Sequence, residues 1–112
     1  MVFKALIIDD EQDICLLLSS FLKKRNIEVM FSHTLRDGFR LIENFKPDLL
    51  FLDNNLPDGS GIDSIEQIRK LSKEMRIIVI SALTNLQQKA LENSADGFIG
   101  KPISFDNISQ HI

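Results

Sequence analysis

The sequence predicts an α/β fold in which helices cover both faces of a doubly wound parallel sheet. Three short apolar runs occur at residues 3–8, 49–52 and 77–80, and only the first is interrupted, by Lys4. Such runs are typical of parallel strands that are buried on both faces. Weaker strand patterns and stretches with helical periodicity lie between them, so strand and helix alternate five times. This alternation predicts a five-stranded parallel sheet with crossover helices.

Two strands and two helices are expected in the first half of the chain. A strand at residues 3–8 is followed by a weaker one at residues 27–31, whose polar Glu28 suits an edge position. Basic residues at 23–25 fill the last turn of the first helix, where positive charge suits the helix dipole. Pro47 ends the second helix. The apolar stripes are Ile14, Leu17, Leu18, Phe21 and Leu22, then Leu35, Phe39, Ile42 and Phe45.

The second half continues the same order with three strands and three helices. Strands are expected at residues 49–52, 77–80 and 97–100, each followed by a helical pattern. Ser104 is placed to cap the last helix, which runs to the end of the chain at Ile112. The apolar stripes are Ile62, Ile65 and Ile68, then Leu86, Ala90 and Leu91, and finally Phe105, Ile108 and Ile112.

Length and composition predict one globular domain over residues 1–112. The chain is 44% hydrophobic and 26% charged, and its single cysteine, Cys15, excludes an internal disulfide bond and fits a reducing compartment. A net charge of −3 argues against nucleic-acid binding by this domain alone. The apolar runs are too short for a membrane span, so we expect a cytoplasmic domain.

Four of the expected strands are followed directly by a residue with a carboxylate, a hydroxyl or an ammonium group. Asp9 and Asp10 come after the first, Asp53 after the third, Ser81 and Ala82 after the fourth, and Lys101 and Pro102 after the fifth. In open parallel sheets, ligands bind beyond the carboxyl ends of the strands. This edge of the sheet is therefore the predicted site.

The charges of this edge indicate its chemistry. Two carboxylates about 4 Å apart repel by roughly 4 kcal/mol at an effective dielectric constant of 20. Clustered carboxylates therefore take up protons or hold a cation, and few protein oxygens with room for waters suit Mg²⁺. An aspartate beside such a metal and a lysine points to phosphoryl chemistry, with Asp53 as the nucleophile that forms an acyl phosphate.

The chain resembles the receiver domain of two-component response regulators over nearly its whole length. The resemblance rests on Asp9–Asp10, on Asp53 followed by L-P-D-G-S-G, and on the pairs Ser81–Ala82 and Lys101–Pro102. It implies a flavodoxin-like fold with strand order 2-1-3-4-5. It further implies that Asp53 accepts a phosphoryl group from a histidine kinase or a histidine phosphotransfer protein. Mg²⁺ or Mn²⁺ would be held by Asp10, Asp53 and the main-chain carbonyl of Asn55, with Asp9 acting mainly through water.

The resemblance also implies a conformational switch rather than an enzyme with a separate substrate. Lys101 and Ser81 would contact the phosphoryl oxygens, and the small Ala82 leaves room for them. Phe98 occupies the position of a switch aromatic, although a role in the core is the alternative. Its movement would change the face made by helix 4, strand 5 and helix 5, which would control an output domain, a partner protein or a homodimer. The bond before Pro102 is expected to be cis.

One residue departs from the family pattern, and three others are interpreted as having no role in the site. Ser94 stands where a glycine usually ends helix 4, so we expect Asn93 to take the left-handed cap position instead. Cys15 is expected to be a small buried residue. His33 and His111 have no predicted partners and are interpreted as surface residues.

Other functions remain alternatives at this stage. A flavin-phosphate site would need loops rich in Ser, Thr and Gly, whereas the first loop reads D-D-E-Q-D. An aspartyl phosphatase would need a second acid where Asn55 stands. A binding module that has lost the switch would not need the acidic pair, Ser81 and Lys101.

Because the stripe ending at Ile112 is unfinished, we expect the fifth helix to be truncated and the domain to be cut from a longer protein. A natural single-domain regulator is the alternative.

Overall fold

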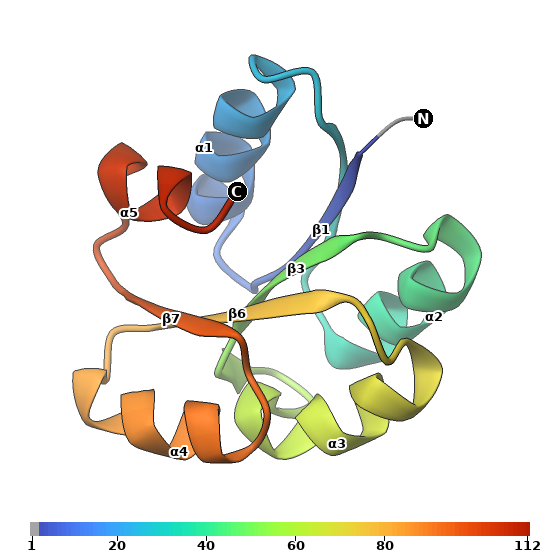
Figure 1. Ribbon diagram of the computed structural model, residues 1–112, viewed down its shortest axis with the longest axis vertical. Helices are drawn as coiled ribbons and strands as arrows, with labels where there is room; N and C mark the ends of the chain where they lie inside the picture. Colours follow the sequence, from blue (N-terminus) through green and yellow to red (C-terminus); the bar gives the residue numbers. More distant parts are fainter. Residues whose placement is uncertain (1–2) are drawn as a thin grey trace.

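A five-stranded parallel sheet lies between two layers of helices in the computed structural model, which describes residues 3–112 (Figure 1). A two-stranded hairpin, β4–β5, joins β3 to α3, and a 3₁₀ helix, η1, precedes α4. The strands are β1 (Lys4–Ile8), β2 (Glu28–Ser32), β3 (Leu49–Asp53), β4 (Asn55–Leu56), β5 (Gly59–Ser60), β6 (Arg76–Ser81) and β7 (Gly97–Gly100). The helices are α1 (Gln12–Lys23), α2 (Leu35–Phe45), α3 (Gly61–Leu71), η1 (Thr84–Leu86), α4 (Gln87–Glu92) and α5 (Phe105–Ser109).

The strand order of the main sheet is β2-β1-β3-β6-β7, and all neighbouring strands are parallel. Counted without the hairpin, this is the predicted order 2-1-3-4-5. The weaker strand, β2, lies at an edge, as predicted from its polar residue. Within residues 3–112, none of the helices combines the length and the apolar character needed to cross a membrane.

Alternate strand residues feed two separate cores, one on each face of the sheet. Helices α1 and α5 cover one face, and α2, α3 and α4 cover the other (Figure 1). In β1, Ala5 and Ile7 join the core under α1 and α5, whereas Leu6 and Ile8 join the opposite core. Both faces of each central strand are therefore buried, which explains the unbroken apolar runs in the sequence.

The buried stripe of α1 differs from the predicted one at Leu17, which is 41% exposed. The buried stripe is centred on Cys15, Leu18 and Leu22, which follow the helical spacing i, i+3, i+7 and lie fully in the core. Leu17 precedes Leu18 by one position and turns toward solvent. The prediction was therefore wrong for Leu17 and is confirmed for the buried Cys15.

The last helix, α5, is shorter than predicted and ends at Ser109. Beyond it the backbone bonds change to i→i−3 spacing, from His111 N–H to Ile108 O at 3.0 Å and from Ile112 N–H to Ser109 O at 3.4 Å. Of the predicted stripe, Ile108 is fully buried, while Phe105 and Ile112 are 54% and 40% exposed. Phe105 instead stacks on Phe21 of α1, with ring centroids 4.8 Å apart.

The end of α4 also corrects an expectation. Ser94 has a φ of 74° and occupies the left-handed position, whereas Asn93 has a φ of −92°. The Asn93 side-chain amide donates to the Lys89 carbonyl at 2.7 Å, and the Ser94 carbonyl accepts from the Arg69 guanidinium at 2.8 Å. These contacts hold Ser94, rather than Asn93, in the conformation that a glycine would otherwise supply.

Candidate functional site

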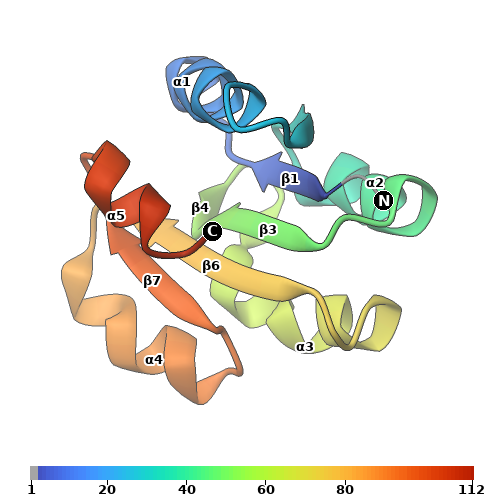
Figure 2. The same cartoon turned by 45° about the horizontal axis from the view of Figure 1, so that its top comes forward.

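Three carboxylates meet at the carboxyl edge of the sheet. The arrowheads of β1, β3 and β6 point to the same side in Figure 2, and this side holds the residues that follow them. Asp9 and Asp10 follow β1, and Asp53 is the last residue of β3. One carboxylate oxygen from each of the three lies within 4.8 Å of the others. The structure therefore brings together the acidic residues that the sequence places beyond separate strands.

Burial makes two of these charges costly. Asp9 is fully buried and Asp53 is 3% exposed, whereas Asp10 is exposed. Burial raises the pKa of Asp9. Burial first, and then the negative charge of Asp9, raise the pKa of Asp53 to about 6. An added positive charge would stabilise the ionised carboxylates.

Lys101 supplies a positive charge beside these carboxylates. Its Nζ lies 3.2 Å from Asp9 Oδ2, 3.1 Å from Glu11 Oε1 and 3.3 Å from Asp53 Oδ1. Burial lowers the pKa of Lys101, but the charges of Asp53 and Asp9 more than offset this, so the pKa is raised. Lys101 is therefore held as an ammonium ion between the carboxylates.

The donor set fits a divalent cation. Asp9 Oδ1 accepts the Glu11 backbone N–H at 2.8 Å, but the buried Asp9 Oδ2 accepts no hydrogen bond from the described residues. Its contact with Lys101 is an ion pair without hydrogen-bond geometry. Asp9 Oδ2 is thus a buried carboxylate oxygen without a hydrogen-bond donor, and it lies beside two further carboxylates. Together these carboxylates offer the hard oxygen ligands that Mg²⁺ binds.

The remaining predicted site residues lie on β6 and β7 or directly after these strands. Ser81 is buried, and its Oγ accepts the Leu83 N–H at 3.0 Å, so it holds the loop before η1. Ala82 is exposed, and Phe98 is half-buried against the core that α2, α3 and α4 cover. The Lys101 backbone N–H donates to the Ser81 carbonyl at 2.9 Å, and the bond between Lys101 and Pro102 is cis.

The loop after Asp53 is tightly held, and glycine is required within it. A Cβ at Gly61 would lie 2.2 Å from the Asp53 carbonyl oxygen, so only glycine lets α3 begin against the end of β3. Asn54 Oδ1 accepts from the Ser60 hydroxyl at 2.9 Å and from the Ile62 N–H at 3.1 Å. Asn55, the first residue of β4, is exposed. The hairpin itself was not predicted, because two-residue strands carry no periodicity.

Sequence reasoning assigned no role to two residues beside the site. Glu11 follows the acidic pair after β1, at the edge where the sequence places carboxylates, and it contacts Lys101. His33 is exposed, as predicted, but it has a partner, since its Nδ1 lies 2.9 Å from the Asp9 carbonyl oxygen. Its place directly after β2 was the available signal.

Known proteins resemble this chain in sequence and in fold. Residues 5–112 match the response regulator receiver domain family. The chain belongs to this family. The resemblance stated from the motifs is thereby confirmed, and with it the flavodoxin-like fold. The chain is a receiver domain of two-component signalling, a family of phosphoacceptor switches that bind Mg²⁺ at an acidic pocket.

Two curated relatives are transcriptional regulators. The receiver domain is 35% identical over 109 residues to the KDP operon transcriptional regulatory protein KdpE of Escherichia coli (strain K12), covering 96% of this chain and 48% of the relative. It is 35% identical over 113 residues to the uncharacterized transcriptional regulatory protein YvcP of Bacillus subtilis (strain 168), covering 99% of this chain and 47% of the relative. The chain thus spans about half the length of these relatives.

A solved structure has the same fold. A CheY-like response regulator receiver domain protein from Methanospirillum hungatei JF-1 superposes with a TM-score of 0.89 at 28% identity, covering 98% of this chain and 90% of that one.

Proposed function

We propose that Asp53 accepts a phosphoryl group from a histidine kinase or a histidine phosphotransfer protein. A carboxylate oxygen of Asp53 attacks phosphorus, the bond between phosphorus and the donor imidazole breaks, and the released imidazole takes up a proton. The product is an aspartyl phosphate, which later loses its phosphoryl group to water. The domain processes no separate substrate.

The observation that carries this proposal is the setting of Asp53. It lies at the buried end of the central strand β3, within 4.8 Å of two other carboxylates and 3.3 Å from the Lys101 ammonium group. A turn-forming aspartate would be solvated, whereas Asp53 is 3% exposed. The cluster and Lys101 can together receive a group that carries close to two negative charges.

Asp10, Asp53 and the main-chain carbonyl of Asn55 would hold Mg²⁺ or Mn²⁺, with Asp9 mainly through water. When bound, the cation offsets the charge of the phosphoryl oxygens. Asp10 is the exposed member of the cluster, so it suits exchange of the cation with solvent. Lys101 would remain available for a phosphoryl oxygen.

Ser81, Lys101 and Phe98 form the proposed switch. The Ser81 hydroxyl would turn to a phosphoryl oxygen, give up its bond to the Leu83 amide and shift the loop before η1. Register supports this coupling, because Ser81 pairs with Gly100 and Val79 with Phe98 across β6 and β7. Ala82 would leave room for the phosphoryl group, and Phe98 would turn inward.

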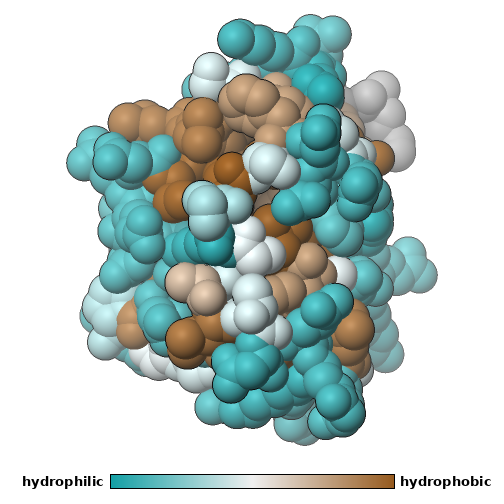
Figure 3. All heavy atoms as spheres, turned by 90° about the vertical axis from the view of Figure 1, so that its left-hand side faces the viewer, coloured by the Kyte–Doolittle hydropathy of each residue, from teal (hydrophilic) through white to brown (hydrophobic). Residues whose placement is uncertain are grey.

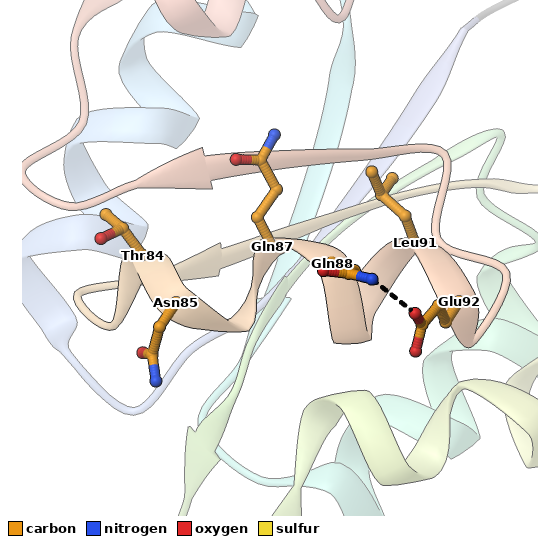
Figure 4. Close-up of a pocket in the computed structure, with 6 residues that line it drawn as sticks. All are labelled: Thr84, Asn85, Gln87, Gln88, Leu91 and Glu92. Atoms are coloured by element: carbon orange, nitrogen blue, oxygen red, sulfur yellow. Dashed lines mark hydrogen bonds between the residues drawn. The ribbon is translucent and has the colours of Figure 1, made fainter.

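The switched face would be that of α4, β7 and α5. Figure 3 shows this side, where hydrophobic atoms gather toward the top, around α1 and α5. Leu91, Phe105 and Ile112 are exposed. Six residues of η1 and α4 line an open groove (Figure 4), and none of them belongs to the acidic site: Thr84, Asn85, Gln87, Gln88, Leu91 and Glu92.

This face would control an output domain, a separate partner protein or a second copy of the domain in the cytoplasm. The relatives named as transcriptional regulators support an output that acts on transcription. The net charge of −3 means that DNA contacts would come from another part of the protein. Phosphorylation of the wild type and Asp53→Asn by acetyl phosphate with Mg²⁺, followed by mass measurement, tests the proposed function.

A further inference from the structure

Asp58, in the turn of the hairpin that follows Asp53, completes the N-terminus of a helix that lies far from it in the sequence. Its Oδ1 accepts the Leu35 N–H at 2.8 Å and its Oδ2 accepts the Arg36 N–H at 2.9 Å. These are the first two amides of α2. The two hydrogen bonds lower the pKa of Asp58, so the carboxylate is ionised at neutral pH.

The first turn of α2 thereby has every amide satisfied. Thr34, its N-cap, accepts the Asp37 N–H through Oγ1 at 3.2 Å, and the Thr34 carbonyl accepts the Gly38 N–H at 3.0 Å. The Thr34 side chain thus satisfies the third amide, the fourth makes the first regular i→i−4 helical bond, and the hairpin satisfies the first two. A helix normally leaves the amides before its first i→i−4 bond to caps or water. The N-terminus of α2 is therefore completed by the loop that follows the phosphoacceptor.

The hairpin that carries Asp58 is held from both sides. Asn54 Oδ1 ties it to α3 through Ser60 and Ile62. On the other side the hairpin lies close to α2, since a Cβ at Gly59 would lie 3.1 Å from Leu35 Cδ1. Asn55, whose carbonyl is a proposed metal ligand, pairs with Ser60 inside this clamped unit.

We propose that Asp58 is a positioning residue that fixes the Asn55 carbonyl by anchoring the hairpin to α2. Metal binding at the acidic site would then strengthen the hydrogen bonds that Asp58 accepts at the N-terminus of α2. This inference rests on the proposed function, because it needs the Asn55 carbonyl as a ligand. By linkage, a metal that prefers the clamped loop strengthens the Asp58 cap, and the cap strengthens metal binding by the same factor. Metal binding at the site would then affect α2 independently of Ser81 and Phe98.

The test is a Mg²⁺ titration of wild type, Asp58→Ala, Asp58→Asn and Thr34→Ala, followed by the ¹H–¹⁵N signals of residues 35, 36 and 55. Mutation of a group that hydrogen-bonds directly to a metal ligand typically lowers metal affinity by about 10–100-fold. Asp58 is more remote from the metal, so Asp58→Ala should weaken Mg²⁺ binding by about 3–10-fold. Asp58→Asn, which keeps an acceptor oxygen, should recover part of the loss. Thr34→Ala also removes a cap of α2 but leaves the hairpin anchored, so its Mg²⁺ affinity should equal that of the wild type.

In the wild type, Mg²⁺ should also shift the amide signals of Leu35 and Arg36, and Asp58→Ala should abolish that response. Equal Mg²⁺ affinity in the wild type and Asp58→Ala would overturn the inference and leave the proposed function standing. Equal losses in Asp58→Ala and Thr34→Ala would also overturn it, because helix stability alone would explain them. A wild type that binds no Mg²⁺ would overturn the proposed function, and this inference with it.

Discussion

Lys101 Nζ lies 3.3 Å from Asp53 Oδ1, although 48 positions separate the two residues in the sequence. The same ammonium group contacts Asp9 and Glu11. One cation is thus shared by three carboxylates, and its side chain is only 11% exposed. The metal-free site depends on this lysine for charge balance.

Lys101→Ala should therefore destabilise the metal-free protein, because buried carboxylates lose their counter-charge. Removal of one partner of a fully buried pair costs about 3–5 kcal/mol, and because Glu11, one of the three partners, is exposed, we expect a smaller loss of about 2 kcal/mol here. Urea denaturation measures it, with Lys89→Ala as the control, since Lys89 pairs with Asp63 in an exposed position. Mg²⁺ should restore much of the lost stability. A variant that Mg²⁺ does not stabilise would speak against the acidic cluster as a cation site.

Asp10→Ala should reduce Mg²⁺ affinity by at least about tenfold, because one ligand and one negative charge are removed together. Calorimetric titration of the variant against the wild type measures the change. Asp106→Ala is the matched control, since it removes an exposed aspartate from α5, outside the acidic cluster. Unchanged affinity in Asp10→Ala would refute the proposed ligand set.

Ser81→Ala should leave some phosphorylation at Asp53 but uncouple it from the far face. Coupling between two sites of a protein is typically about 1–3 kcal/mol, and most of it should be lost with the hydroxyl. Phosphorylation-dependent NMR shifts around Phe98 and α4 should shrink, whereas Ser72→Ala, which removes a hydroxyl directly after α3, should keep them. Full wild-type shifts in Ser81→Ala would contradict the switch.

The sheet and the position of the site could be predicted because they depend on long patterns. Buried strands give unbroken apolar runs, and the carboxyl ends of parallel strands share one edge, so Asp9, Asp53 and Lys101 had to converge there. Contacts made by single side chains across the fold leave no such pattern. The contacts of Asp58 and His33 could not be predicted, because their partners are backbone groups that any sequence offers.

The predictions for the ends of α4 and α5 were wrong where the local preference of a residue and its packing disagree. Ser94 takes a left-handed conformation that asparagine tolerates better, because its carbonyl is held by Arg69. Phe105 leaves the core stripe because it stacks on Phe21. Both outcomes depend on residues distant in the sequence.

Asp96 offers a test of pH dependence away from the site. Its Oδ2 accepts the Ile77 N–H and the Arg69 guanidinium, each at 2.8 Å. Burial raises the pKa of Asp96, but these two bonds more than offset it, so the pKa lies below its usual value of 3.8. A lowered folded-state pKa contributes stability that is present above the unfolded pKa and is lost as pH falls through the folded one.

Asp96→Ala should consequently cost about 1–3 kcal/mol of unfolding free energy at neutral pH, because the buried Ile77 N–H loses its acceptor. The cost should shrink as pH falls below 3.8, the value from which the Asp96 pKa is lowered. Denaturation curves at several pH values measure it. Asp63→Ala, which breaks an exposed pair with Lys89, should cost less than about 1 kcal/mol. A cost for Asp96→Ala that does not vary with pH would contradict this assignment.

The most direct test of the central claim is the mass of the protein after incubation with acetyl phosphate and Mg²⁺. The wild type should gain one phosphoryl group, bound to Asp53 as an acid-labile acyl phosphate, and Asp53→Asn should gain none, because the amide lacks the nucleophilic carboxylate oxygen. Omission of Mg²⁺ should suppress the gain. Equal labelling of Asp53→Asn, or an acid-stable phosphate on a serine, would contradict the assignment of Asp53 as the phosphoacceptor.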